Sequence, residues 1–308
     1  METRRLANFI AIVDCGSLTR AAERMHVAQP ALSQQLAGLE AAYEKTLVSR
    51  SRQGITVTPA GRALYRNAQT VLRQLKQLES DVKSAGDYVS GHVSVGLPVS
   101  CAPIVSMPLI QAVHERFPHI LLQISENLSG LLGELILNNR LDLAMLYAAH
   151  GSEGLIRKPL LIERLCLVNV AALAPSLDVD NTVSVRQLAD VPLVLPSHSN
   201  GLRALVDAAF SRHGLKPRIV AEIDSLPSLR AAAECGFAAT ILPRSATSAD
   251  TGSLLVTDIV GPTIERTIVL CRPSAPAISE PVQAIENVMI DTIEVLVASG
   301  KWQGVTRI

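Results

Sequence analysis

Apolar residues recur at helical spacing in three short runs over the first forty positions, and only tight turns fit between the runs. Gly16 suits the end of the first helix, and Ser17 suits the N-cap of the second. Pro30 suits the first turn of the third, where a missing N–H costs nothing. This pattern predicts a helix-turn-helix. The expected apolar faces are Leu6, Phe9, Ile10 and Val13, then Leu18, Ala21, Ala22 and Met25, and then Leu32, Leu36 and Leu39.

The other face of the third helix is free of large apolar groups and of carboxylates. Glutamine can pair with adenine edges, serine can donate or accept, and proline and alanine can touch thymine methyl groups. These are the residue types that can enter a major groove, so we expect this helix to read DNA. The predicted DNA-binding residues of the helix-turn-helix are Ser17, Gln29, Pro30, Ala31, Ser33 and Gln34.

A β-hairpin with two arginines is predicted after these helices. Leu47-Val48 and 55–57 have strand composition, and Gly54 suits the turn between them. Arg50 and Arg52 would lie at the tip, where guanidinium groups can contact phosphates or the minor groove. The alternative is a solvated surface turn, but a basic hairpin beside a helix-turn-helix favours a DNA-binding wing.

Thr58-Pro59 predicts the start of a long helix, with Thr58 as its N-cap. Its apolar positions alternate steps of four and three residues as far as Val89, while charged residues occupy the other faces. Packing on its own globular domain is the alternative, but so regular a stripe favours pairing with a second copy of the chain. The predicted dimerisation residues are Leu64, Ala68, Val71, Leu75, Leu78 and Val82.

The stretch "GSLTRAAERMHVAQPALSQQLAGLE", followed by "TPAGRALY", resembles the winged helix-turn-helix and linker helix of the LysR-type transcriptional regulators. The resemblance continues through "SGHVSVGLP" to "ATILP", so it covers nearly the whole chain. The motifs "LDLAMLY" and "SLRAAAECGFAATILP" are most similar to the nitrogen-assimilation-control subgroup. The resemblance implies a regulator that binds an interrupted palindrome in double-stranded DNA as a homodimer or homotetramer, with RNA polymerase as a further candidate partner.

Strand and helix patterns alternate from residue 91 onward, after a turn-rich joint at 86–91. Such alternation predicts α/β units on a largely parallel sheet, and hence an α plus α/β fold for the whole chain. The family resemblance implies two lobes like those of a periplasmic binding protein. The expected divisions are 1–58 for the winged helix-turn-helix, 59–90 for the linker helix, 91–161 with 266–298 for lobe I, 162–265 for lobe II, and 299–308 for a loose tail.

Three strand-to-helix loops carry groups that suit a small ligand. Backbone N–H groups at helix N-termini, together with hydroxyls, favour a small anion or carboxylate. Serine and asparagine also cap helices in proteins that bind nothing there, so both interpretations stand. The resemblance implies an inter-lobe effector cleft at these positions. The expected effector-binding residues are Ser100, Cys101, Ser129, Tyr147, Ser197, Ser199 and Asn200.

The distribution of charged residues and of cysteines indicates where DNA binds and in which compartment the protein works. Residues 1–90 contain 12 Lys and Arg against 8 Asp and Glu, whereas the rest contain 16 against 20, so the basic part is the predicted DNA-binding part. Five scattered cysteines without a Cys-x-x-Cys pair favour a reduced, cytoplasmic protein.

No signal peptide, membrane-spanning run, metal-ligand spacing or catalytic motif is visible in the sequence. We therefore expect no cofactor besides a small-molecule effector, no membrane partner and no enzymatic activity. One alternative is a solute-binding module or enzyme with an appended helical domain, in which His198 beside two serines would be the only catalytic candidate. Another is a dimerisation scaffold, which leaves the polar recognition face unexplained.

Overall fold

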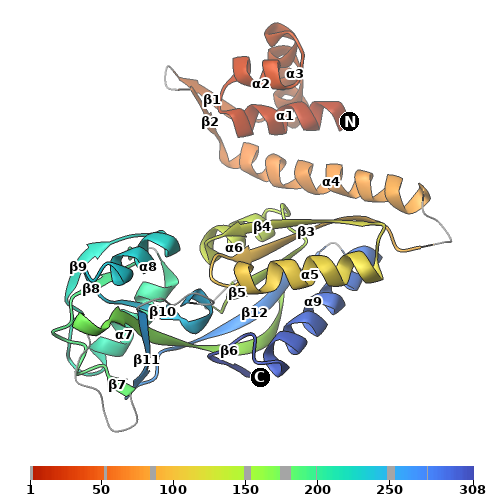
Figure 1. The fold of residues 1–308 in the computed structure, drawn as a ribbon. Helices are drawn as coiled ribbons and strands as arrows, with labels where there is room; N and C mark the ends of the chain where they lie inside the picture. Colours follow the sequence, from red (N-terminus) through yellow and green to blue (C-terminus); the bar gives the residue numbers. More distant parts are fainter. Residues whose placement is uncertain are drawn as a thin grey trace. The chain divides into compact units, whose positions relative to one another are not determined.

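The computed structural model describes residues 3–51, 54–83, 88–148, 154–173, 182–198, 200–247, 254–275 and 277–308. These residues form two compact units, one built on helices α1 to α4 with a small hairpin, and the other on the elements from β3 to β13 (Figure 1). Among the helices of the described segments, none is long and apolar enough to cross a membrane.

The first unit begins with α1 (Thr3–Cys15), α2 (Leu18–Arg24) and α3 (Gln29–Tyr43), as the apolar spacing predicts. The Ser17 hydroxyl accepts a hydrogen bond from Arg20 N at 3.5 Å, so Ser17 is the N-cap of α2. Pro30 lies in the first turn of α3. The expected apolar face of α1 is wrong in part, because Ile12 is buried and Ile10 and Val13 are only half-buried.

A two-stranded antiparallel hairpin follows, formed by β1 (Val48–Ser51) and β2 (Gly54–Val57). Arg50 pairs with Ile55 in its register, whereas Arg52 lies outside the described residues. The Glu40 carboxylate accepts hydrogen bonds from Leu47 N at 2.8 Å and Val48 N at 3.3 Å. The first acidic residue of α3 therefore anchors the hairpin.

Helix α4 (Pro59–Lys83) starts where the Thr58 hydroxyl accepts a hydrogen bond from Gly61 N at 3.0 Å, which confirms Thr58 as its N-cap. The helix ends at Lys83, so the expected continuation to Val89 is wrong, because Val89 lies in a loop before β3.

The second unit alternates strands and helices. Its first half contains β3 (Gly91–Pro98), α5 (Ala102–Arg116), β4 (Ile120–Asn127), α6 (Ser129–Leu137), β5 (Leu143–Tyr147) and β6 (Leu155–Val170), followed by the 3₁₀ turn Ala171–Leu173. The second half contains β7 (Thr182–Ser184), β8 (Leu193–Leu195), α7 (Gly201–Ser211), β9 (Ile219–Glu222), α8 (Leu226–Glu234), β10 (Thr240–Pro243), the 3₁₀ turn Arg244–Thr247, β11 (Leu254–Val260), β12 (Glu265–Pro273), α9 (Glu280–Ala298) and β13 (Val305–Arg307).

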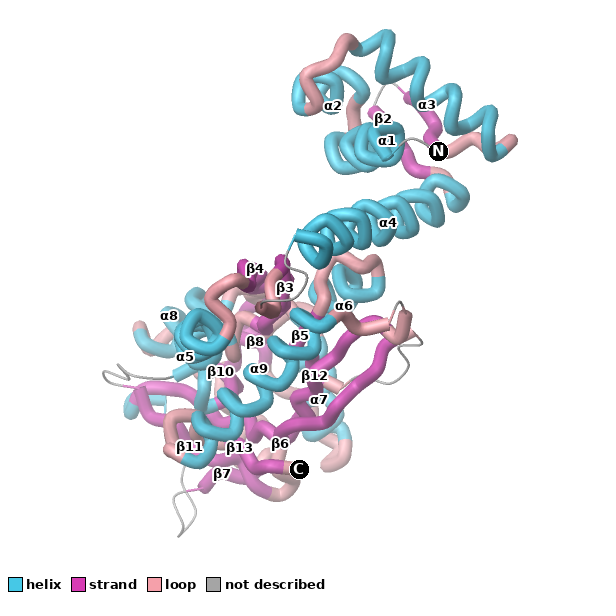
Figure 2. The backbone as a smooth tube through the Cα atoms, turned by 90° about the vertical axis from the view of Figure 1, so that its right-hand side faces the viewer, coloured by secondary structure: helices cyan, strands magenta, loops and turns pink. Residues whose placement is uncertain are grey.

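Strand β6 joins two parts of one sheet, whose order is β4-β3-β5-β12-β6-β11-β7, with β10 and β13 also paired to β6. Its first half pairs with β12 and β13, and its second half with β10 and β11 (Figure 2). We call the part around β3, β4 and β5 lobe I, and the part around β7 to β11 lobe II. The β3–β5, β7–β11 and β8–β9 pairs are parallel, but β6 pairs antiparallel with β10, β11, β12 and β13. The sheet is therefore mixed, and not largely parallel as expected.

Helices cover the sheet in both lobes. In lobe I, α5 and α9 lie side by side (Figures 1 and 2). In lobe II, α7 and α8 contribute Phe210 and Leu229 to a core that also contains Leu195 and Ile241. The expectation of a loose C-terminal tail is wrong, because Trp302 is buried and β13 pairs with β6.

Candidate functional site

The polar face of α3 is presented as a recognition helix requires. Gln29, Pro30, Ala31 and Gln34 are exposed, and Ser33 is half-buried. Their helix is held against α1 and α2 by Leu32, Leu36 and Leu39, which pack into the first unit's core. The Glu40 carboxylate is turned toward the start of β1, so its charge is already engaged by two backbone N–H groups. The exposed side of α3 thus carries no carboxylate over its first turns that would repel the phosphates of DNA.

Two polar contacts orient the helices of this unit, and the sequence analysis missed both. Asn8, buried on α1, donates from Nδ2 to Gln35 Oε1 at 2.5 Å and so ties α1 to α3. Tyr65 on α4 donates its hydroxyl proton to Asp14 on α1. Burial, and then the hydrogen bond to Asp14, raise the pKa of Tyr65 to about 12. The sequence does contain one signal for the first contact: Asn8 is an isolated polar residue within the apolar face of α1, which indicates a buried hydrogen bond.

The predicted stripe of α4 divides into two parts. Leu64 packs against the core of the first unit, and Ala68 is 1% exposed in the single chain. Ala68 therefore packs within the chain, which corrects its prediction as a dimerisation residue, whereas Leu64 is only half-buried and stays a predicted dimerisation residue. The remaining four are exposed, and the exposed fraction rises to 58% at Leu78 and 70% at Val82. The exposed members are Val71, Leu75, Leu78 and Val82.

The predicted effector residues of lobe I meet at the lobe junction. The Ser100 and Tyr147 hydroxyls lie 2.5 Å apart, and Cys101 Sγ lies 3.5 Å from the Tyr147 hydroxyl. Tyr147 N donates to Ser129 Oγ at 3.1 Å. Burial raises the pKa of the Cys101 thiol to about 12 and that of Tyr147 well above its usual value, so both groups stay protonated at neutral pH.

Three residues that sequence reasoning missed complete this arrangement. The Arg266 guanidinium stacks on the Tyr147 ring, 3.5 Å from its centroid, and donates to Ser100 Oγ at 3.2 Å. Its Nε donates to Glu163 Oε2 at 2.8 Å, and the Ser245 hydroxyl donates to Glu163 Oε1 at 2.8 Å. The Glu163 and Arg266 side chains are 0% and 7% exposed. We call Ser100, Tyr147, Glu163, Ser245 and Arg266 the junction cluster.

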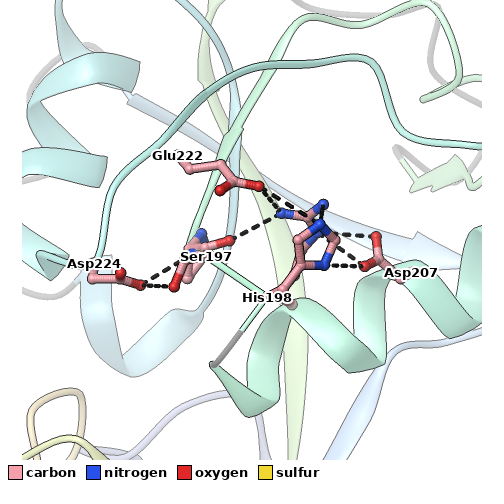
Figure 3. A network of polar contacts seen from close by, with 7 residues as sticks. Ser197, His198, Asp207, Glu222 and Asp224 are labelled. Atoms are coloured by element: carbon pink, nitrogen blue, oxygen red, sulfur yellow. Dashed lines mark hydrogen bonds and ion pairs between the residues drawn. The ribbon is translucent and has the colours of Figure 1, made fainter.

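Of the predicted effector residues of lobe II, Ser197 lies in a separate polar network (Figure 3). Asp224 Oδ1 accepts from both the backbone N and the hydroxyl of Ser197, each at 3.0 Å. The Asn200 side chain accepts from Leu202 N at 3.0 Å and so caps α7. Ser199 lies outside the described residues. We call Ser197, His198, Arg203, Asp207, Glu222 and Asp224 the lobe II network.

Arg203 organises this network although it is almost fully buried. Its Nε donates to both Asp207 oxygens at 3.0 Å, and its Nη1 donates to Glu222 Oε1 at 2.7 Å. Its Nη2 lies 3.0 Å from His198 Nε2, and because a guanidinium can only donate, that imidazole nitrogen accepts. The Ser197 hydroxyl donates to Asp224, and the second serine beside His198 lies outside the described residues.

Two family models match the chain. The bacterial regulatory helix-turn-helix of the LysR family matches residues 3–62, and the LysR substrate binding domain matches residues 86–293. The chain belongs to the LysR family. It is a DNA-binding transcriptional regulator, as the sequence analysis predicts, and its relatives are regulators and not enzymes. Among the residues with described structure, no group of histidine, cysteine and acidic side chains has the geometry of a metal site.

The resemblance to the nitrogen-assimilation-control subgroup is confirmed. The chain is 38% identical over 296 residues to the nitrogen assimilation regulatory protein nac of Escherichia coli, with 95% of each chain covered. The corresponding protein of Klebsiella aerogenes is 36% identical over the same coverage.

Solved structures confirm the fold. A full-length OxyR variant from Pseudomonas aeruginosa has a TM-score of 0.71 at 24% identity, covering 96% of this chain and 95% of that one. The LysR family regulator CbnR in complex with its target DNA has a TM-score of 0.67 at 22% identity, covering 96% and 99%.

Proposed function

We propose that this regulator binds an interrupted palindrome as a dimer that can assemble into a tetramer, and that a small molecule bound between the two lobes adjusts the arrangement of its DNA-binding heads. The exposed, uncharged face of α3 carries the first part of this proposal. In this proposal the exposed Gln34 reads a base edge, while Arg50 and Arg52 supply contacts that do not depend on sequence. The solved complex of CbnR with its target DNA supports this mode of action for a protein of the same fold.

Self-association is supported by the exposed stripe of α4. Four large apolar side chains lie on one side of a helix whose other residues are largely charged or polar. Such a stripe is stable in water when a second copy covers it. Pairing of two α4 helices would present two copies of α3 together, as recognition of a palindrome requires.

The effector part is supported by the convergence of the predicted residues. Ser100, Ser129 and Tyr147 come from three different loops or strand ends and meet beside the strands that connect the lobes. A ligand there would act by binding one lobe arrangement more tightly than another. We further propose that the protein works in the cytoplasm, where its DNA is, and that it contacts RNA polymerase at the promoters it controls.

Gel-shift titration of the full chain with genomic fragments, and then with one selected operator, tests the DNA-binding mode. Gln34→Ala should cost about 1–3 kcal/mol against the operator and leave random DNA binding unchanged. Arg52→Ala should weaken operator and random DNA alike and flatten the dependence of affinity on salt. Gln111→Ala removes an exposed helical glutamine of the second unit and is the matched control. Equal losses on both DNAs for Gln34→Ala would refute base reading by α3.

A further inference from the structure

Two arginines with little solvent exposure border the proposed effector residues, and each already has a carboxylate partner. Arg266 donates to Ser100 in lobe I and is paired with Glu163 at 2.6 Å. Arg203 donates to the carbonyl oxygen of Pro196, next to Ser197, and is paired with Asp207 and Glu222. A carboxylate or phosphate ligand is normally recognised by an arginine whose fork of donors is free for it. In both networks the chain's own carboxylates occupy that fork.

The backbone donor that could hold an anion in lobe II is engaged as well. Ser197 N and the Ser197 hydroxyl, which together suit a small anion, both donate to Asp224 Oδ1 at 3.0 Å. Asp224 therefore lies where the carboxylate of a ligand would bind these groups. The sequence predicts an anion at this loop, and the structure places an internal one there.

The charges of the two networks show the consequence. In the junction cluster, the positive charge of Arg266 and the negative charge of Glu163 cancel each other. In the lobe II network, Arg203 is paired with the carboxylates of Asp207 and Glu222, and Asp224 adds a third carboxylate beside Ser197. An approaching anion thus meets charge that is balanced or negative. Binding would strip the anion of its hydration shell, which costs free energy. Neither arginine of these networks has an unpaired guanidinium that could offset this cost.

We infer that Glu163 and Asp224 determine the specificity of the effector site and that it takes a polar molecule without net negative charge, such as an amide, alcohol or amine. This inference rests on the effector site proposed above. The hydroxyls of Ser100 and Tyr147 remain suited to such a ligand, because each can exchange its present hydrogen bond for one to an amide or hydroxyl group. A carboxylate becomes a ligand only when an internal carboxylate is removed.

Ligand titration of the full chain by thermal shift and calorimetry tests the inference. The probes are benzoate and succinate, their amides benzamide and succinamide, and inorganic phosphate, all at matched ionic strength. The two carboxylates and phosphate should leave the melting temperature of the wild-type chain unchanged. Glu163→Gln removes the negative charge that pairs with the Arg266 guanidinium, and Asp224→Asn removes the negative charge that faces the donors of Ser197, while each amide oxygen can still accept a hydrogen bond. Each variant should bind at least one carboxylate roughly tenfold more tightly than the wild type does, which corresponds to about one additional charge-assisted hydrogen bond.

Glu265→Gln is the matched control, because Glu265 is an exposed partner of Arg164 and its substitution removes the same charge outside both networks. This variant should bind carboxylates no more tightly than the wild type does. Glu163 is buried, so its variant can fail to fold. Asp224 is exposed, so we expect its variant to fold and to decide the test by itself. The inference is overturned if the wild type binds a carboxylate through Ser100, as shown by loss of that binding in Ser100→Ala, or if Asp224→Asn shows no increase in carboxylate affinity.

The same titration separates this inference from the proposed function. If no small molecule changes the stability or the DNA footprint of the wild-type chain, the effector part of the proposed function is refuted. The increase in carboxylate binding by the two variants is measured independently of that response and still decides whether Glu163 and Asp224 exclude anions.

Discussion

Gly61, in the first turn of α4, has no room for a methyl group. A Cβ at this position would lie 2.0 Å from the carbonyl oxygen of Leu47 and 2.8 Å from Cγ1 of Val57. The Leu47 carbonyl is held in place, because it accepts hydrogen bonds from the backbone N and the hydroxyl of Thr58, each at 3.0 Å. Gly61→Ala should therefore push the hairpin away from the start of α4, although alanine is normally the better helix former.

The magnitude follows from the groups that must move. Displacing Leu47 breaks two hydrogen bonds of about 1 kcal/mol each, and it disturbs the Thr58 cap, which contributes about 1 kcal/mol more. The helix propensity of alanine returns about 1 kcal/mol. We expect Gly61→Ala to destabilise the first unit by about 2 kcal/mol. Gly38→Ala on α3 is the matched control, since a Cβ there meets nothing within 4 Å, and it should stabilise by up to about 1 kcal/mol.

Hydrogen exchange of peptides from α1 and α3 in the full chain measures the free energy of opening of this unit in both variants. Operator affinity, read by gel shift, should fall for Gly61→Ala because the hairpin is displaced. A Gly61→Ala protein as stable as the wild type, or shifted in the same direction as Gly38→Ala, would show that α4 and the hairpin do not pack as described.

Three further predictions concern assembly, cysteine reactivity and acid stability. Leu78→Glu places a charge in the exposed stripe of α4 and should shift the protein toward monomers in sedimentation, whereas a glutamate on the charged face of α4 should not. Iodoacetamide at about pH 8 should label exposed Cys235 well before Cys101, because burial raises the pKa of the Cys101 thiol to about 12; peptide mass spectrometry reads the order. Burial by itself would raise the pKa of Asp258. Hydrogen bonds from Cys166 and Arg244 lower this pKa by more than burial raises it, so the net pKa lies below its usual value. Its stabilising contribution is present above the usual pKa near 4 and is lost as the pH falls through the lowered native pKa, and Asp258→Asn should flatten the melting temperature over that acid range, from about pH 4 downward. Identical acid profiles for the two proteins would contradict the contribution assigned to Asp258.

The sequence by itself determined the elements that depend on neighbours along the chain. Caps at Ser17 and Thr58, the proline at the start of α3 and the apolar spacing of the first three helices act over a few residues, so they can be read in order. The absence of large apolar groups from the polar face of α3 is equally local. These features are enough to predict the helix-turn-helix, the exposed polar face of α3 and the long helix that follows.

Only the tertiary structure decided which groups meet across the second unit. Glu163 and Arg266 are 103 residues apart in sequence, and Asp224 reaches Ser197 from 27 residues away. Neither pair has a local signal, because its members are far apart in sequence, and the buried charges of Glu163 and Arg266 look in the sequence like surface charges until partner strands cover them. The antiparallel pairing of β6 with β12 brings the first pair together. Long-range strand pairing, which local periodicity does not specify, therefore set the charge of the candidate effector site.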